Sequence, residues 1–229
     1  MCSRASHPRP APYYHTGRTK INLQDKYHNF ADLISQEQES RDFERIAIER
    51  RSRLAVVVPH GGSIEPGTSE IGRAIAADDF SLYCFEGLKT QQPEDLHITS
   101  HHFDDPLCLK IVRSAWMVVA IHGCTGSHPV VHAGGLHLGI KNKVIEALYE
   151  AGFDAQAADQ RHSGTNRSNI CNQGISTQGL QMEITEGLRQ AMFAGLDRKS
   201  RQITTPAFAR FVAAVRSVLV QVQSENEDM

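Results

Sequence analysis

Short apolar runs alternate along this chain with segments whose apolar residues recur at helical spacing. Two continuous runs, LAVVV at 54–58 and WMVVAI at 116–121, are typical of strands buried on both faces of a sheet. Further strands are predicted at 81–85, 96–100 and 180–185. Helices are predicted at 69–77, 108–114, 144–151 and 206–222, and a weaker helical pattern lies within 27–53. Strands that alternate with helices predict an α/β fold, a three-layer α/β/α sandwich around a largely parallel sheet.

The ends of the chain differ from its centre. Residues 1–24 contain Pro8, Pro10 and Pro12, which interrupt any regular pattern, so we expect a flexible arm there. No internal repeat is visible. We therefore expect one domain over 25–224, followed by a short tail at 225–229.

Composition narrows the function classes. The 229 residues are 40% hydrophobic and carry a formal charge of -2, so neither a nucleic-acid footprint nor a polybasic membrane patch is expected. No apolar run approaches the roughly 20 residues that span a bilayer. The first twenty residues lack the apolar centre of a secretory signal, and the five cysteines contain no CxxC pair, so a reducing cytoplasm is the expected compartment. Twelve histidines raise the question of a metal or acid–base site.

The first candidate site follows the strand predicted at 54–58. The chain continues as PHGGSIE, which puts His60 at the carboxyl end of the strand and Glu65 five residues further on. Ligands of open α/β sheets bind at these strand ends, and two ligands from one loop are a usual part of a catalytic zinc site. The alternative is structural: His60 in a turn, and Glu65 at a helix start, where negative charge is favourable.

The strand predicted at 116–121 runs in the same way into His122 and Gly123. Two strands that each end in His-Gly would place both imidazoles along one edge of the same sheet. His60, Glu65 and His122 then form a His-Glu-His set, which is a known catalytic zinc composition. Two such strand ends favour metal binding over the structural alternative.

Glu183 lies in the alternating strand at 180–185. Leu180, Met182 and Ile184 face one side, so Glu183 points to the other side and can reach the cleft. A metalloenzyme needs a carboxylate that takes a proton from the attacking water and passes it to the leaving amine. The alternative is a solvated carboxylate, or one paired with an arginine such as Arg189.

A polar stretch at 160–173 (QRHSGTNRSNICNQ) could contact substrate. Its arginine and asparagine side chains are donors of the kind that hold a carboxylate, and the candidates are Arg167, Asn169 and Asn172. A surface loop whose asparagines satisfy their own turns is the alternative. Among other residues, His128 and His132 could line the cleft, and Cys124 is interpreted as a small buried residue.

Four motifs in order resemble the poly-γ-glutamate hydrolase family of phage-encoded zinc enzymes and their bacterial homologues. They are VVVPHGGSIEPGTSEIGRAIAADDFSLYCFEGLK, LHITSHHFDDP, VVAIHGC and NICNQGISTQGLQMEITEGLR. The resemblance covers about 27–193. It implies a fold similar to zinc carboxypeptidases, with an α/β/α sandwich around a mixed sheet.

The resemblance also implies residue roles. Zinc would be held by His60 and Glu65 of the HGGxIE motif and by His122, with Glu183 as the catalytic glutamate. Related peptidases hold a substrate carboxylate with Asn and Arg. Where the family reads NICNRG this chain has Gln173 in place of the arginine, and Arg167 is the residue that could substitute in the carboxylate contact.

We therefore expect an enzyme with one Zn²⁺ per chain that hydrolyses amide bonds, with γ-glutamyl linkages as the first choice. Its partner would be a small-molecule, peptide or polymer substrate rather than nucleic acid or a membrane. One alternative is a zinc deacylase or amidase of small N-acyl amino acids or cell-wall peptides. Another is a metal-free binding module of phage origin.

Overall fold

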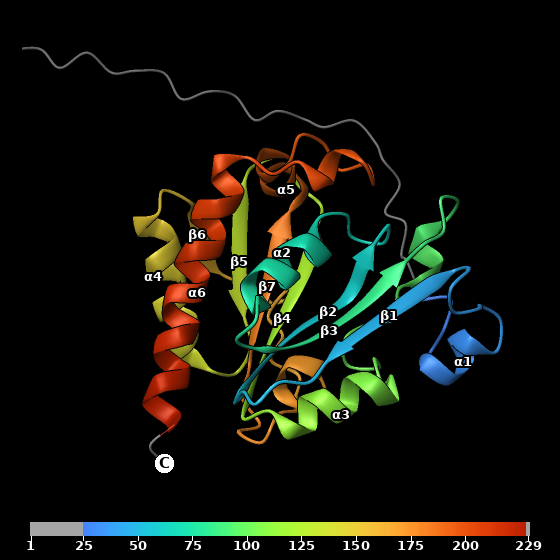
Figure 1. The fold of residues 1–229 in the computed structure, drawn as a ribbon, viewed down its shortest axis with the longest axis horizontal. Coiled ribbons are helices and arrows are strands. Elements are labelled where there is room, and N and C mark those ends of the chain that lie inside the picture. The colour runs from blue at the N-terminus through green and yellow to red at the C-terminus, as the bar shows by residue number, and fades with distance from the viewer. Residues whose placement is uncertain (1–24, 228–229) are drawn as a thin grey trace, which may run out of the picture.

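A seven-stranded sheet forms the centre of the protein (Figure 1). The computed structural model describes residues 25–227, so the predicted arm at 1–24 and the last two residues of the predicted tail lie outside the described part. The strands are β1 (Phe43–Ile48), β2 (Leu54–Gly62), β3 (Ser81–Gly87), β4 (Met117–Cys124), β5 (Val130–Gly134), β6 (Asp154–Ala157) and β7 (Leu180–Thr185). The α-helices are α1 (Phe30–Ile34), α2 (Thr68–Ala76), α3 (Pro106–Ser114), α4 (Leu138–Glu150), α5 (Glu186–Met192) and α6 (Pro206–Glu227), and single 3₁₀ turns are η1 (Pro93–Leu96), η2 (Ile170–Asn172) and η3 (Ser200–Gln202).

The strand order is β1-β3-β2-β4-β7-β5-β6. The central strands β3, β2, β4 and β7 run parallel to one another, and β5 pairs in parallel with β6. Two antiparallel pairs, β1 with β3 and β5 with β7, make the sheet mixed. The sheet is therefore mixed and largely parallel, which confirms the predicted fold class.

Two hydrophobic cores lie on opposite faces of this sheet. The first core packs α2, α4, α5 and α6 against one face, and the second packs α1, α3 and η2 against the other. Strand β2 contributes to both, because Leu54, Val56 and Val58 enter the first core while Ala55 and Val57 enter the second. A strand buried on both faces has no polar side to show, which explains its unbroken apolar run.

Most predicted elements are present, with shifted ends. The helix predicted at 144–151 begins earlier, at Leu138, and Gly152 follows it with a positive φ of 83°, as expected just after a helix C-terminus. The last helix runs past 222 to Glu227. No helix within residues 25–227 is both long and apolar enough to cross a membrane.

The prediction of a strand at 96–100 is wrong. Leu96 ends η1, and the following residues pair with no strand. Leu96 and Ile98 are buried in the second core, so the apolar pattern reports burial rather than sheet pairing. A side chain takes the place of a neighbouring strand as hydrogen-bond partner here, since the backbone N–H of Thr99 donates to the Asp25 carboxylate at 2.6 Å.

The weak helical pattern at 27–53 resolves into a short helix and a strand. Only α1 is helical, and β1 is an antiparallel edge strand beside β3. The sequence of β1, FERIAI, combines charged with apolar residues, as is common in strands at the edge of a sheet. Strands β5 and β6, four or five residues each, were not predicted.

Candidate functional site

The predicted chemistry gathers at the carboxyl ends of β2, β4 and β7. These strands are consecutive in the sheet and parallel. His60 lies near the end of β2, and His122 on β4 stands directly opposite Glu183 on β7. Glu65 follows β2 in the loop that leads to α2. The topology therefore brings together four residues separated by up to 123 positions (183 − 60) in the chain.

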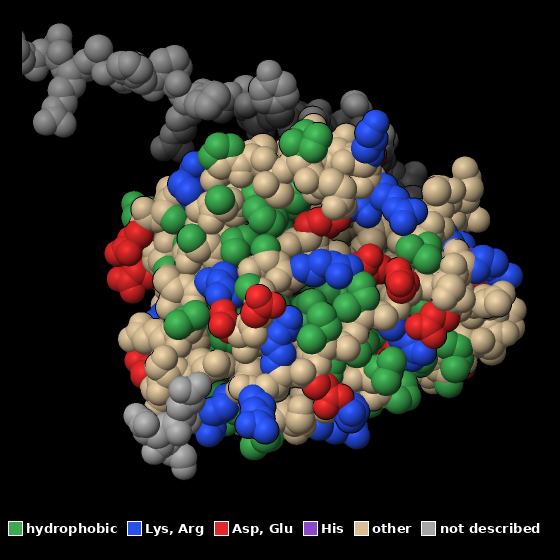
Figure 2. All heavy atoms as spheres, in the orientation of Figure 1, with side chains coloured by type: hydrophobic (Ala, Val, Ile, Leu, Met, Phe, Trp, Pro, Cys, Tyr) green, Lys and Arg blue, Asp and Glu red, His purple; other side chains and the backbone are tan. Residues whose placement is uncertain are grey.

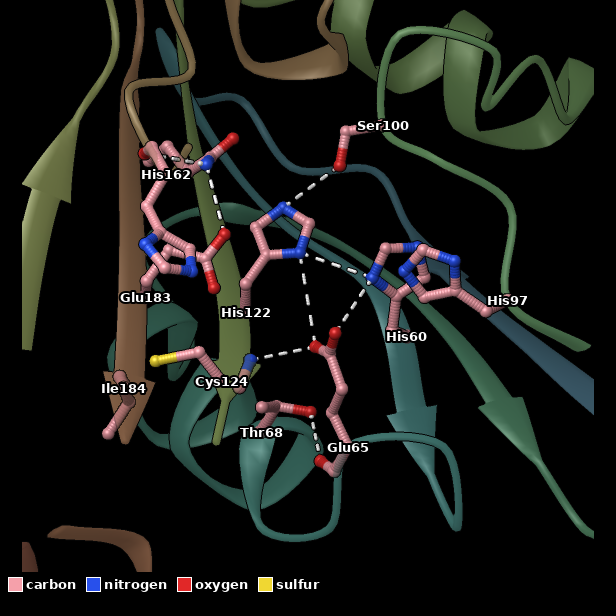
Figure 3. Close-up of polar contacts among 12 residues, drawn as sticks. His60, Glu65, Thr68, His97, Ser100, His122, Cys124, His162, Glu183 and Ile184 are labelled. Carbon is pink, nitrogen blue, oxygen red and sulfur yellow. Dashed lines mark hydrogen bonds and ion pairs between the residues drawn. The ribbon is translucent and has the colours of Figure 1, made fainter. Parts of the chain in front are cut away.

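Two imidazoles and one carboxylate converge on a common point (Figure 3). The Nδ1 atoms of His60 and His122 are 3.2 Å apart, and Oε1 of Glu65 is 3.2 Å from Nδ1 of His60. The other carboxylate oxygen, Oε2, accepts the Gly123 N–H at 2.7 Å. One ligand atom from each of the three residues lies within 4.8 Å of the others. The sequence-predicted His-Glu-His set is thus assembled in space.

In both rings the outer nitrogen, Nε2, contacts a polar group of the protein, and this contact affects whether the inner nitrogen, Nδ1, carries a proton. Nε2 of His60 lies 2.8 Å from the Ile98 carbonyl, which can only accept, so Nε2 carries the proton and Nδ1 keeps its lone pair. Nε2 of His122 lies 3.3 Å from the Ser100 hydroxyl. Two imidazole nitrogens and a carboxylate facing one another with such outer contacts are typical of metal-ligating histidines. These residues fit a divalent cation of the zinc type.

Burial and neighbouring charges shift the pKa values of these three side chains. Burial lowers the pKa of His122 to about 3, so its ring is neutral at neutral pH. Burial also opposes charge on His60, but the Glu65 carboxylate outweighs it and raises the pKa of that imidazole. Glu65 has its own pKa lowered, because His60 outweighs the opposing effect of burial. A metal ion and a proton therefore compete for Nδ1 of His60.

Glu183 lies beside these three residues and is partly buried. Burial and, next, the Glu65 carboxylate raise the pKa of Glu183. A cation between His60, Glu65 and His122 would have the opposite effect, since nearby positive charge favours the carboxylate. The Gln181 side chain donates from Nε2 to Oε1 of Glu183 at 3.1 Å and so orients the carboxylate.

Arg189, the alternative partner considered for Glu183, donates elsewhere. Its guanidinium bonds three backbone oxygens, those of Pro66, Ile184 and Cys124, at 2.7 to 3.1 Å. It therefore ties the loop after Glu65 to the ends of β4 and β7. Because Pro66 follows Glu65 directly, these bonds position the loop that carries this carboxylate.

The loop at 160–173 is structured largely by its own amides. Asn169 donates to Oε1 of Gln181 at 2.9 Å, and Asn172 donates to the carbonyls of Gly164 and Asn166 while accepting from Leu136 and Gly179. Both asparagines are buried. Substrate binding by Asn169 and Asn172 stays a prediction, but the contacts seen for them hold the loop. Arg167 is exposed, and Gln173 donates to the Ser168 carbonyl at 2.8 Å.

Sequence reasoning missed several residues at this site. His97 stacks on His60 with ring centroids 3.9 Å apart, and its Nδ1 lies 2.7 Å from Oδ1 of Asp25. His162 and Cys124 lie next to Glu183. Cys124 is half-buried rather than fully buried, and burial together with Glu183 raises the pKa of its thiol to about 11. The motif LHITSHH was the available signal for His97, but its position outside a regular strand hid its direction.

Comparisons with known proteins identify the family to which this chain is similar. The sequence model of the family described as "Poly-gamma-glutamate hydrolase" matches residues 27–214. Two Bacillus subtilis (strain 168) relatives are UPF0714 protein YmaC, 36% identical over 86% of this chain and 85% of its own, and UPF0714 protein YndL, 35% identical over 81% and 74%. The match therefore covers most of this chain and of its relatives.

Solved structures give the same result. A bacteriophage poly-gamma-glutamate hydrolase superposes with a TM-score of 0.86 at 26% identity, over 89% of this chain and all of that one. Zinc-free apo YndL superposes with a TM-score of 0.83 at 34% identity, over 87% and 99%. An N-formylglutamate amidohydrolase from Ralstonia eutropha JMP134, 10% identical with a TM-score of 0.51 over 82% and 99%, shares the fold alone.

Proposed function

Because this chain belongs to the poly-gamma-glutamate hydrolase family, we propose that it is a zinc-dependent hydrolase of γ-glutamyl amide bonds. The observation that carries the proposal is the convergence of His60, Glu65 and His122 beside Glu183 at one sheet edge. A relative that exists in a zinc-free form and a phage enzyme that acts on poly-γ-glutamate support the metal and the substrate class.

In this proposal each residue has a distinct task. The imidazoles of His60 and His122 and the carboxylate of Glu65 would hold one zinc ion per chain. A zinc ion bound there supplies a Lewis acid that polarises the scissile carbonyl and brings the pKa of a water molecule to about 7. The Ile98 carbonyl and the Ser100 hydroxyl hold both rings in the orientation in which they would bind the ion.

Glu183 carries the proton. Its carboxylate takes a proton from the attacking water as the new carbon–oxygen bond forms. It then gives that proton to the departing nitrogen as the carbon–nitrogen bond breaks, so the products are a carboxylate and an amine. Gln181 holds the carboxylate in place through both steps, because its amide donates to Oε1 and is itself bonded by Asn169.

The test separates proton transfer from metal binding. Glu183→Gln keeps the size of the side chain but removes the base, so turnover of poly-γ-glutamate should fall by about 10²–10⁴-fold while zinc content stays that of the wild type. Glu186→Gln, an exposed residue on α5, is the matched control and should keep its activity. Full activity in Glu183→Gln would remove Glu183 from the base role.

Substrate comparison decides between the candidate activities. Poly-γ-glutamate and single N-acyl amino acids are offered to the zinc-loaded protein. Preference for the polymer supports the proposal, whereas cleavage of the small compounds alone would make the protein a deacylase. A protein that binds no zinc and cleaves neither would be a binding module.

A further inference from the structure

A second group of metal-ligand atoms lies beside the first and includes Glu183. The Sγ atom of Cys124, a ring nitrogen of His162 and a carboxylate oxygen of Glu183 all lie within 4.8 Å of one another. Figure 3 shows these three side chains gathered on the side of His122 away from His60. They come from the end of β4, the loop after β6 and the middle of β7.

The sheet and its neighbours hold this group in place. Cys124 ends β4 opposite Thr185 of β7, two positions beyond the pair formed by His122 and Glu183. His132 of β5 lies opposite Glu183 on the other side, and its ring stacks on His162 with centroids 5.8 Å apart. The three ligand side chains are therefore positioned by strand pairing and ring packing.

The orientation of His162 is set by an acid. Its Nδ1 lies 3.0 Å from Oδ1 of Asp159, which accepts the Nδ1 proton and leaves the lone pair on Nε2. A carboxylate behind a histidine is the usual outer contact of a metal ligand. The exposed Asp159 carboxylate therefore does for His162 what the Ile98 carbonyl does for His60.

We propose that Cys124, His162 and Glu183 form a second, weaker divalent-metal site, at which zinc in excess of the first equivalent inhibits the enzyme. Thiolate, imidazole and carboxylate together suit Zn²⁺, Cd²⁺ and Co²⁺. Binding replaces the thiol proton, which passes to solvent, and forms the metal–sulfur bond. The site is the weaker one because all three ligands are only partly buried and one belongs to a loop, whereas both histidines of the first set are buried.

The inhibitory consequence rests on the proposed function, in which Glu183 is the base. A carboxylate that coordinates a cation is a weaker base, because the bound positive charge stabilises its ionised form, and it accepts the proton of water less readily. Zinc at the second site would thus withdraw Glu183 from catalysis without displacing the ion held by His60, Glu65 and His122. The rate of hydrolysis should fall as zinc rises above one equivalent, and it should recover when the excess is removed.

Cobalt titration tests the site without reference to activity. The first equivalent, held by nitrogen and oxygen, gives no thiolate-to-cobalt charge-transfer absorption, whereas the second equivalent should give it through Cys124. Cys124→Ser should lose this absorption, and His162→Ala should need more cobalt to reach it. Cys2→Ser and His128→Ala are matched controls and should titrate as the wild type. No thiolate absorption at any cobalt ratio, or one that persists in Cys124→Ser, would overturn the second site.

Activity then tests the consequence. For each variant the rate with several equivalents of zinc is divided by its own rate with one equivalent. This ratio should fall several-fold in the wild type and stay near one in Cys124→Ser and His162→Ala. A thiolate signal with an unchanged wild-type ratio would overturn inhibition but keep the site. Absence of any hydrolysis would count against the proposed function alone, because the cobalt signal does not depend on it.

Discussion

Nδ1 of His60 lies 3.2 Å from Nδ1 of His122, although the two residues are 62 positions apart in the chain. Their strands, β2 and β4, are parallel neighbours that pair from Leu54 to Val57. With the Ile98 carbonyl fixing the proton of His60 on its outer nitrogen, the inner nitrogens face each other as ligands rather than as a donor and an acceptor. This contact is the reason that the site is interpreted as a metal centre.

Loss of one ligand should remove the metal. We expect His122→Ala to retain little zinc after dialysis, since two remaining ligands are too few for a stable site, and to lose hydrolysis with it. Metal content by plasma mass spectrometry on protein purified without chelator checks the first part. His137→Ala, a histidine at the start of α4, is the control and should keep about one zinc per chain. Wild-type zinc content in His122→Ala would contradict the assignment.

The outer contacts of the ligands should tune affinity. Ser100 lies 3.3 Å from Nε2 of His122, so Ser100→Ala leaves the ring without this partner. We expect zinc affinity to fall by about 10-fold, the lower end of the range for such contacts. Competition with a chromogenic chelator measures it. Ser217→Ala, on the surface of α6, should leave the affinity unchanged, and an equal loss in both variants would rule out a specific effect.

Gly123 should be intolerant of a side chain. A Cβ there would lie 2.8 Å from Cζ and 2.9 Å from Nε of Arg189, whose guanidinium bonds three backbone oxygens around the site. We expect Gly123→Ala to lower the free energy of unfolding by about 1–3 kcal/mol. Gly139→Ala is the control, because its Cβ would have its nearest contact at 3.9 Å and alanine favours a helix. Urea denaturation of both variants decides, and equal stability would contradict the prediction.

Protonation of Glu37 should lower the stability of the folded protein in acid. Burial would raise the pKa of Glu37, but the hydroxyl of Tyr27 and the ammonium of Lys89, at 2.5 and 3.1 Å, outweigh it and lower that pKa below its ordinary value of 4.5. A carboxyl with a lowered pKa stabilises the fold above its unfolded value, and this contribution is lost as pH falls below 4.5 through the folded value.

Thermal unfolding of a Glu37→Gln variant across that interval measures the effect. The variant should be less stable than the wild type near neutral pH, and the two should approach each other in acid. Glu44→Gln, at an exposed position on β1, should follow the wild-type curve. Parallel curves for Glu37→Gln and the wild type would contradict the assignment.

Much of the fold is readable from residue patterns. The apolar runs of β2 and β4 and the alternation of β7 identify three central strands, since burial on one or both faces dictates their side chains. The edge strand β1 and the short strands β5 and β6 escape the same reasoning. Strands β1 and β6 each pair on one side only and place few residues in a core, so their side chains show little pattern. Strand β5 pairs on both sides and is mostly buried, but its five residues are too few for a clear pattern.

The sequence predicts the main residues of the candidate site, but not the residues that surround them. His60 and His122 lie at or near the ends of parallel strands, and alternation along β7 sets the direction of Glu183, so these patterns suffice to propose that the three residues meet. His97 and His162 lie in loops, and because loops have no regular periodicity the sequence does not predict where their side chains point. The bonds from Asn172 to the carbonyls of Gly164 and Asn166 could not be predicted from the sequence either, and its substrate-binding role stays a prediction.

The face on which the ligands meet is decided by tertiary structure alone. Alternation along β2 would place His60 with Val56 and Val58 in the first core, whereas His122 shares its face with Val118 and Ala120 of the second. The pairing of β2 with β3 shifts register between Val58 and Gly61, and within that bulge His60 packs on the second-core side. The pattern of residues predicts the central strands, which of their residues are buried, and the residue types that could bind a metal. An extra residue in one strand turns the following side chain to the other face, and whether it does so depends on the partner strand.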